Sequence, residues 1–222
     1  MTPEKYNATL AKYVNMGGDV HEERPMLKDD TPGYFVDPHY AVMGLESFRQ
    51  IIRQSPEKHT DIGGDIDFLM YLSEFVPVEH IDLRTPGIGL PRINYIKGDA
   101  LNLPLEDESV ESLSCLSVAE HIGLGRYGDE IDPNGFKKCC AELVRVLRKG
   151  GLLYFAVPCG IPKTVFNAHR VLSFKEVVEA LDGLEIANVC GMSSEGEFNP
   201  SMDEGFLKND PFGCALFVMV KP

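Results

Sequence analysis

The alternation of strand-like and helix-like segments from His59 onward is the feature that most constrains the fold of this chain. Short apolar runs, typical of buried strands, lie at 59–62, 78–83, 93–96, 110–118, 152–157, 184–190 and 215–220. Segments with apolar residues at helical spacing lie among them, at 66–75, 136–148 and 173–181. This alternation predicts βαβ units with right-handed crossovers and a parallel sheet. No clear helix separates the last two strands, so we expect them to form a closing antiparallel pair.

The segment 136–148 has the clearest helical signature. Cys140, Leu143 and Leu147 fall on one face, as a helix packed on a sheet requires. Basic residues near its end suit the negative end of the helix dipole, and Gly150-Gly151 predicts the point where the helix stops.

The length of the chain, 222 residues, suits one domain with a short additional segment. Residues 1–39 are rich in proline, glycine and charge and show little periodicity, so we interpret them as an N-terminal arm or cap. Residues 40–222, which begin with a predicted helix over 40–54, form the main domain in this interpretation.

The charge balance excludes several classes of partner. A net charge of −13 argues against nucleic acid or an anionic membrane surface as the main partner. The N-terminus has no signal-peptide pattern, and no run of about 18 apolar residues predicts a membrane span. The six cysteines lack a CxxC spacing, and we interpret them as buried free thiols of a cytoplasmic protein. A small molecule is the expected partner, and the oligomeric state stays open.

The first candidate ligand site follows the first predicted strand, since ligands of open α/β sheets bind beyond the carboxyl ends of the strands. Asp61 is followed there by Gly63 and Gly64, which allow a sharp turn and close approach of a ligand. A dinucleotide fingerprint requires glycines where this chain has Asp65 and Phe68, so a pyrophosphate is disfavoured. A cationic ligand without phosphate meets no such repulsion. The alternative is that the glycine pair only forms a turn.

Two acidic residues follow the next two strands. Asp82, with Leu83 after it, stands about 20 residues beyond the glycine turn, where an acid can accept hydrogen bonds from ribose hydroxyls. Asp99 and Ala100 precede a short apolar loop that can flank an adenine ring. The alternatives are a helix cap or an Arg84 partner for Asp82, and a solvated turn for Asp99.

The segment after the fourth strand carries the densest chemistry. From Ser117 it runs through Glu120, His121 and Tyr127 in a glycine-rich loop. A second polar cluster at 166–170 includes His169 and follows the fifth strand. Two such clusters at one edge of the sheet predict a substrate pocket. The alternative is that the second cluster caps the following helix and pairs with acids.

The order of these motifs resembles the class I S-adenosylmethionine (SAM)-dependent methyltransferases over roughly residues 58–160. The resemblance implies an α/β fold: a three-layer, Rossmann-like sheet of about seven strands, mostly parallel with an antiparallel last strand, and helices on both faces. It also implies SAM as the cofactor. The implied cofactor residues are Asp61, Gly63, Gly64, Asp65, Asp82, Leu83, Asp99, Ala100 and Ser117. The segments 120–129 and 166–170 further resemble an uncharacterised methyltransferase-like branch.

The expected activity is methyl transfer to a small polar molecule, such as a sugar or metabolite hydroxyl. We expect His121 and His169 to act as bases, Glu120 to orient the imidazole and Tyr127 to contact the substrate. Family members usually carry glycines in place of Asp65 and Asp67, so the alternative is a non-catalytic binding or regulatory module. We expect no metal, because no compact ligand motif such as HExxH occurs.

Overall fold

The computed structural model describes residues 2–17, 20, 37–84, 87 and 89–222, in two units, 1–37 and 38–222. In the first unit, helix α1 spans Pro3–Asn15, with Thr2 as its N-cap. Helix α1 was not predicted, because none of its residues is buried and apolar periodicity is therefore weak. Most of the remaining proline and glycine positions of the predicted arm lie outside the described residues.

The second unit is built on one mixed sheet with the strand order β3-β2-β1-β4-β5-β10-β8-β9. The strands are β1 (His59–Ile62), β2 (Val78–Asp82), β3 (Ile93–Lys97), β4 (Val110–Leu116), β5 (Leu147–Cys159), β8 (Glu185–Met192), β9 (Phe198–Asn199) and β10 (Gly213–Val220). Strands β1 to β5 are parallel, and β10 lies antiparallel between β5 and β8. The predicted mostly parallel sheet with an antiparallel last strand is confirmed. The two-residue strand β9 adds to the seven strands expected.

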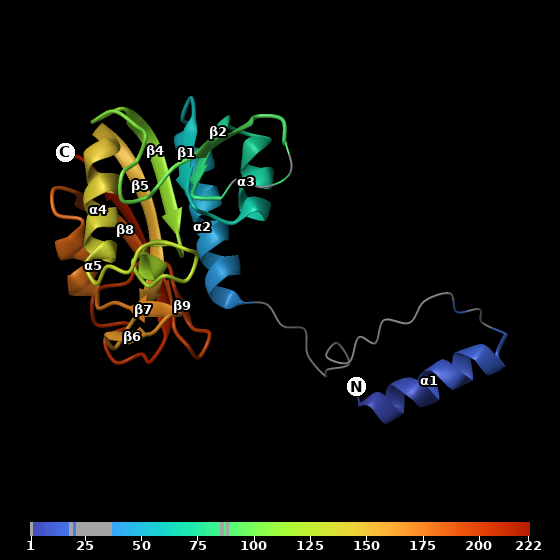
Figure 1. Ribbon diagram of the computed structural model, residues 1–222. Helices are drawn as coiled ribbons and strands as arrows, with labels where there is room; N and C mark the ends of the chain where they lie inside the picture. Colours follow the sequence, from blue (N-terminus) through green and yellow to red (C-terminus); the bar gives the residue numbers. More distant parts are fainter. Residues whose placement is uncertain (1, 18–19, 21–36, 85–86, 88) are drawn as a thin grey trace. The chain divides into compact units, whose positions relative to one another are not determined.

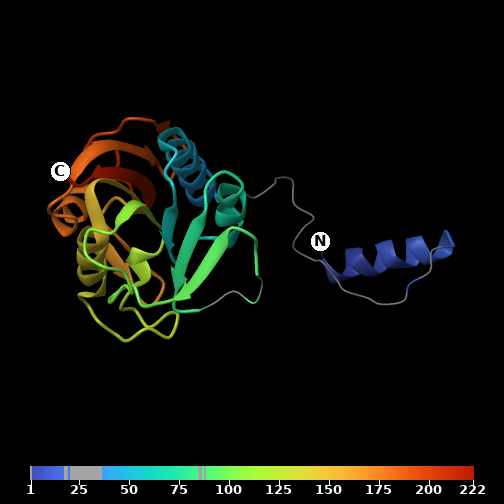
Figure 2. The same ribbon diagram turned by 90° about the horizontal axis from the view of Figure 1, so that it is seen from above.

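Helices cover both faces of this sheet (Figures 1 and 2). On one face lie α2 (Pro38–Gln54) and α3 (Ile66–Ser73), and on the other lie α4 (Gly135–Val146) and α5 (Phe174–Ala180). Each face has its own apolar core, centred on Leu69, Tyr154 and Leu216 on the α2 side and on Leu143, Phe155 and Phe217 on the α4 side. The three-layer arrangement is therefore confirmed.

The predicted end of the helix over 136–148 is wrong. Helix α4 stops at Val146, and Leu147 already begins β5, where it pairs with Val110 of β4 and is fully buried. Arg148 pairs with Glu111 across the strands at 2.7 Å and does not lie in the last helical turn. Burial of Leu147 in the sheet outweighs its helical propensity, and the glycines lie in the irregular start of the strand.

A short hairpin, absent from the prediction, follows β5. Strands β6 (Lys163–Val165) and β7 (His169–Val171) form it, and Arg170 connects it to the segment after β4. All six cysteines are buried and free, as expected. Among the described helices, none is both long and apolar enough to cross a bilayer.

Candidate functional site

A pocket of about 470 Å³ lies at the carboxyl ends of β1 to β4. It contains ten of the residues that the sequence nominated: Gly63, Gly64, Asp65, Asp82, Leu83, Asp99, Ala100, Ser117, His121 and Tyr127. Three nominated residues, Asp61, Glu120 and His169, are not part of its lining. The structure thus brings the motifs from four successive strand ends to one cavity.

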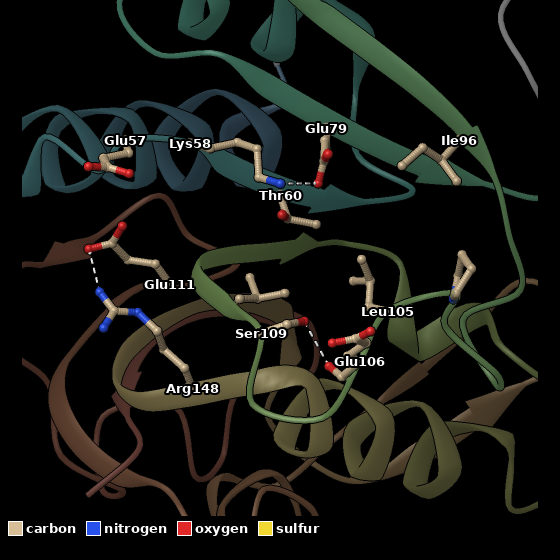
Figure 3. Close-up of a pocket in the computed structure, with 12 residues that line it drawn as sticks. Glu57, Lys58, Thr60, Glu79, Ile96, Leu105, Glu106, Ser109, Glu111 and Arg148 are labelled. Carbon is tan, nitrogen blue, oxygen red and sulfur yellow. Dashed lines mark hydrogen bonds and ion pairs between the residues drawn. The ribbon is translucent and has the colours of Figure 1, made fainter.

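A larger cavity of about 740 Å³ lies toward the amino ends of the strands (Figure 3). Its basic side chains are already paired, Lys58 with Glu79 and Arg148 with Glu111, each at 2.7 Å. It contains none of the nominated residues. Because ligands of open α/β sheets bind at the opposite, carboxyl edge, we assign the site to the smaller cavity.

The glycine turn after β1 requires both of its glycines. Gly63 has φ of 65°, and a Cβ there would lie 2.9 Å from Cγ1 of Val118. A Cβ on Gly64 would lie 2.6 Å from Oδ1 of Asp61. Backbone therefore borders the pocket at this point, as close approach of a ligand demands.

Asp61 lies beneath this turn and is fully buried. Its carboxylate accepts hydrogen bonds from the Gly64 N–H at 2.9 Å, from His80 Nδ1 at 2.9 Å and from the Ser114 hydroxyl. All three of these partners belong to the protein, and Asp61 is not part of the pocket lining, so its contacts support the turn. The cofactor contact expected for Asp61 stays a prediction. The sequence could not distinguish the two roles, because both place an acid at the end of β1.

The polar network below Asp61 extends to His59. Its ring lies between the hydroxyls of Ser112, 2.7 Å from Nδ1, and Ser114, 2.9 Å from Nε2. Burial lowers the pKa of His59 to about 4, so the ring is neutral at physiological pH. Because Ser114 donates its proton to Asp61, it accepts one from Nε2, which assigns the Nε2–H tautomer to His59.

Three of the acids that line the pocket share one geometry. In Asp65, Asp82 and Asp99, Oδ1 accepts the backbone N–H two residues later, at 2.7, 2.7 and 2.9 Å. These turns fix each side chain at its strand end. Within the described ranges, the second oxygen of each carboxylate has no hydrogen-bond partner and remains available to a ligand. Asp65 also caps α3, and Oδ1 of Asp82 lies 3.4 Å from Nε of Arg84, the partner that the alternative for Asp82 named.

Ser117 adopts a strained backbone conformation where β4 ends. Its φ of 56° lies in the left-handed region, which is uncommon for a residue other than glycine. Its N–H donates to the Ala156 carbonyl at 2.8 Å, which anchors the turn to β5. Strain of this kind is frequent at functional sites, and here it directs the chain into the pocket.

His121 lines the pocket and has one unprotonated ring nitrogen. Its Nδ1 lies 2.6 Å from the Ala168 carbonyl, which can only accept, so Nδ1 carries the proton and Nε2 has the lone pair. Burial lowers the pKa of His121 to about 4, and the positive charge of Arg126 acts in the same direction. The group that orients the ring is therefore the Ala168 carbonyl. A main-chain oxygen has no sequence signature, so the sequence did not indicate it.

Glu120 is buried outside the pocket, with a relative exposure of 2%. Its Oε1 lies 3.6 Å from Nε2 of His121, too far for a hydrogen bond, and Oε2 has no partner among the described residues. Burial raises the pKa of Glu120 to about 8, so the carboxyl is mainly neutral at pH 7. The geometry therefore does not match the orienting role expected for it.

His169 also lies outside the pocket lining. Its ring centroid is 5.0 Å from that of Phe212. The neighbouring Arg170 donates to the carbonyls of Ile122 and Glu120, at 2.7 and 3.3 Å. The two polar clusters predicted from the sequence do converge, but the contact is made by main-chain groups and Arg170, and His169 does not reach the cavity.

The glycine-rich loop after β4 folds around Asp129. Although burial raises it, three backbone N–H donors hold the pKa of Asp129 below its usual value. These donors belong to Gly123, Gly125 and Tyr127, at 2.7, 3.2 and 3.1 Å. The loop places the Tyr127 ring at the pocket, where Arg84, a residue with no assigned ligand role in the sequence analysis, also lies.

Comparisons with known proteins support part of this picture. A family model described as "Caenorhabditis protein of unknown function, DUF268" matches residues 104–206. Phthiotriol/phenolphthiotriol dimycocerosates methyltransferase 1 of Mycobacterium ulcerans is 32% identical over 42% of this chain and 33% of its own length. Ubiquinone/menaquinone biosynthesis C-methyltransferase UbiE of Campylobacter jejuni is 29% identical over 55% of this chain and 46% of its own length. The chain thus spans less than half the length of these relatives.

Solved structures are similar over nearly the whole chain. The [4+2]-cyclase SpnF has a TM-score of 0.63 at 14% identity, with coverage of 97% of this chain and 93% of its own. The 1,6-didemethyltoxoflavin-N1-methyltransferase of Burkholderia thailandensis was solved with S-adenosylhomocysteine (SAH). It has a TM-score of 0.60 at 15% identity, with coverage of 100% of this chain and 91% of its own. The chain has the fold of the class I SAM-dependent methyltransferases.

Proposed function

We propose that residues 40–222 form a SAM-dependent methyltransferase domain that acts on a small polar molecule. The observation that carries this proposal is the set of three acids at the ends of successive strand segments, each with one oxygen held by its own turn and the other available. Such an array suits a ligand with hydroxyl, amine and ammonium groups and no phosphate. The buried, free cysteines support a cytoplasmic location.

The residues of the pocket divide naturally among the parts of SAM. Asp82 accepts hydrogen bonds from the ribose hydroxyls, and Asp99 with Ala100 borders the adenine. The backbone at Gly63 and Gly64 adjoins the methionine part, and the free oxygen of Asp65 faces its ammonium. The hydrogen bond from Asp67 N–H holds Asp65 at the amino end of α3, which supports a place for its side chain beside the cofactor.

His121 is the base in this proposal. SAM supplies an activated methyl group on a sulfonium with a good leaving group, so the protein contributes mainly by positioning, worth up to roughly 7–11 kcal/mol. A hydroxyl acceptor must also lose a proton, and His121, which lines the pocket, has an unprotonated Nε2 at neutral pH. Proton transfer to such a base contributes on the order of 10²–10⁴-fold. His169 has no such access and is not needed.

A non-catalytic module is the second candidate, and one observation favours it. Asp65 stands where the family usually has glycine. The same fold also occurs in a [4+2]-cyclase, an enzyme with a different type of reaction. The fold by itself does not determine the reaction.

Calorimetric titration with SAM and SAH tests the proposal. We expect a Kd of about 1–100 μM for wild type and at least tenfold weaker binding for Asp82→Ala, which is about 1.4 kcal/mol. Asp203→Ala is the matched control, since Asp203 forms the same turn with the Gly205 N–H at 2.9 Å and is not in the pocket lining. Absence of heat at millimolar SAH from folded protein would refute the cofactor assignment.

A further inference from the structure

Two arginines lie at one aromatic ring of the pocket lining. The acids at the ends of the first strands, Asp65, Asp82 and Asp99, form the part assigned to the cofactor. Arg84 and Arg126 both contact the ring of Tyr127. Arg126 and Lys163 are also close enough to His169 to lower its pKa. In a chain with 34 acidic and only 21 basic residues, this pair of arginines is a candidate anion site.

Tyr127, a residue of the pocket lining, contacts two arginines, of which Arg84 also lines the pocket and Arg126 does not. The guanidinium carbon of Arg84 lies 4.7 Å from the centroid of the Tyr127 ring, and that of Arg126 lies 5.0 Å from it. Both distances are within the range of cation–π contacts. A guanidinium over an aromatic ring can still donate N–H hydrogen bonds to a planar acceptor. The ring of Tyr127 thus brings two positive groups near the cavity.

Neither guanidinium forms a close ion pair with a carboxylate of the described residues. Arg126 donates from Nη1 to the Ala168 carbonyl at 3.0 Å and makes no ion pair with any residue whose placement is described. Arg84 has only a long contact, 3.4 Å from Nε to Asp82, and its side chain is 63% exposed. Asp129 is occupied by three backbone N–H groups of its own loop. Glu130, which also borders the pocket, is exposed.

The positive charge of Arg126 lies close to the imidazoles of His121 and His169. Nη1 of Arg126 lies 3.3 Å from Nδ1 of His121. Burial lowers the pKa of His169, and the charges of Arg126 and Lys163 lower it further. A group bound to Arg126 is therefore close to His121, the proposed base.

From this geometry we infer that the methyl acceptor carries an anionic group, a carboxylate or a phosphate, which binds to Arg84 and Arg126 beside Tyr127. The inference rests on the proposed function, because only a methyltransferase has a methyl acceptor. It narrows the small polar substrate to a carboxylic acid or a phosphate ester. Guanidinium groups bind both anions through paired N–H donors. The bound anion balances the two cations and places a neighbouring hydroxyl of the same molecule near Nε2 of His121.

The test uses three small probes: inorganic phosphate, benzoate and the neutral benzamide. Each is titrated into ¹⁵N-labelled full chain, with and without saturating SAH, and the amide signals of the 123–129 loop are followed. We expect saturable shifts with phosphate or benzoate at a Kd of about 1–10 mM and none with benzamide. Binding becomes at least fivefold weaker in Arg126→Gln and in Arg84→Gln, on the order of magnitude expected for loss of one charged hydrogen-bond donor.

Two further variants serve as controls. Arg126→Lys retains the charge and recovers part of the affinity, whereas Arg148→Gln, a change in the other cavity, leaves it unchanged. Three outcomes would overturn the inference: equal shifts with benzamide, an affinity equal to that of wild type in both glutamine variants, or no saturation at about 50 mM, roughly fivefold above the expected Kd. If SAH fails to bind but the anions still bind through both arginines, the methyltransferase proposal falls and the anion site stands.

Discussion

Replacement of Asp61 by alanine tests whether this residue supports the glycine turn or contacts the ligand directly. The Asp61 carboxylate is fully buried and accepts from Gly64 N–H, His80 Nδ1 and the Ser114 hydroxyl. Alanine removes the acceptor and leaves all three donors without it. Buried donors that lose their partner retain the full cost of their desolvation.

The magnitude follows from the number of donors. Each orphaned buried group costs about 1–3 kcal/mol, and partial relaxation or entry of water lowers the total for three groups. We therefore expect Asp61→Ala to reduce the free energy of unfolding by about 3–5 kcal/mol, the range found when one partner of a buried pair is removed. For a chain of this size, about 2–4 °C per kcal/mol predicts a decrease in Tm of roughly 6–20 °C.

Urea denaturation of wild type and variant provides the measurement, with an unchanged m-value as the sign that the folded state is preserved. Asp67→Ala is the matched control, since Asp67 is exposed in the first turn of α3 and its loss should cost less than about 1 kcal/mol. A variant within about 1 kcal/mol of wild type would refute the supporting role. It would return Asp61 to the set of direct ligand contacts.

Three further predictions concern the same region. The pKa of Glu120 is raised to about 8 in the folded state from 4.5, so its contribution to stability is full below pH 4.5 and is lost as the pH rises to about 8. Between pH 6.5 and 8, His59 and His121 are neutral in the folded state but still release protons in the unfolded state near pH 6.5, and they do so in wild type and in Glu120→Gln alike. The difference in unfolding free energy between wild type and Glu120→Gln should therefore fall by up to about 1.4 kcal/mol per pH unit, and a difference that stays constant over this range would contradict the prediction. Gly64→Ala places a Cβ 2.6 Å from Oδ1 of Asp61, so we expect a loss of about 1–3 kcal/mol in urea denaturation, and an unchanged midpoint would show that the turn adjusts freely. With an identified acceptor, His121→Asn should lower kcat by about 10²–10⁴-fold at unchanged SAH affinity, while His169→Asn should retain activity within tenfold. Equal losses of kcat in both variants would refute the assignment of His121 as the base.

The sequence by itself determined the architecture and the edge of the sheet at which the site lies. Apolar runs separated by helical patterns predict β1 to β5 with their crossovers, because burial between two layers of helices requires that pattern. The absence of a clear helix between the last strands predicted β10 in its antiparallel position. Asp82 and Asp99 were found by position alone, since parallel strands bring their carboxyl ends to the same edge.

Tertiary structure alone decided which of the nominated residues reach the pocket. Asp61 and Asp82 are both acids at strand ends, but Asp61 is turned into a buried network with His80 and Ser114, residues that come from other strands. Glu120 and His121 are adjacent in sequence, yet one is buried outside the cavity and the other borders it. The orientation of a side chain depends on partners distant in the sequence, and local patterns carry no information about them.

The same limit applies to the contacts that define the chemistry of the site. The Ala168 carbonyl sets the tautomer of His121 from 47 residues away. Arg84 and Arg126 meet on Tyr127 although β3 and β4 lie between the two arginines in the chain. A main-chain oxygen is common to every residue, and a cation–π contact has no spacing rule. These features therefore exist only once the sheet has formed and brought its loops together.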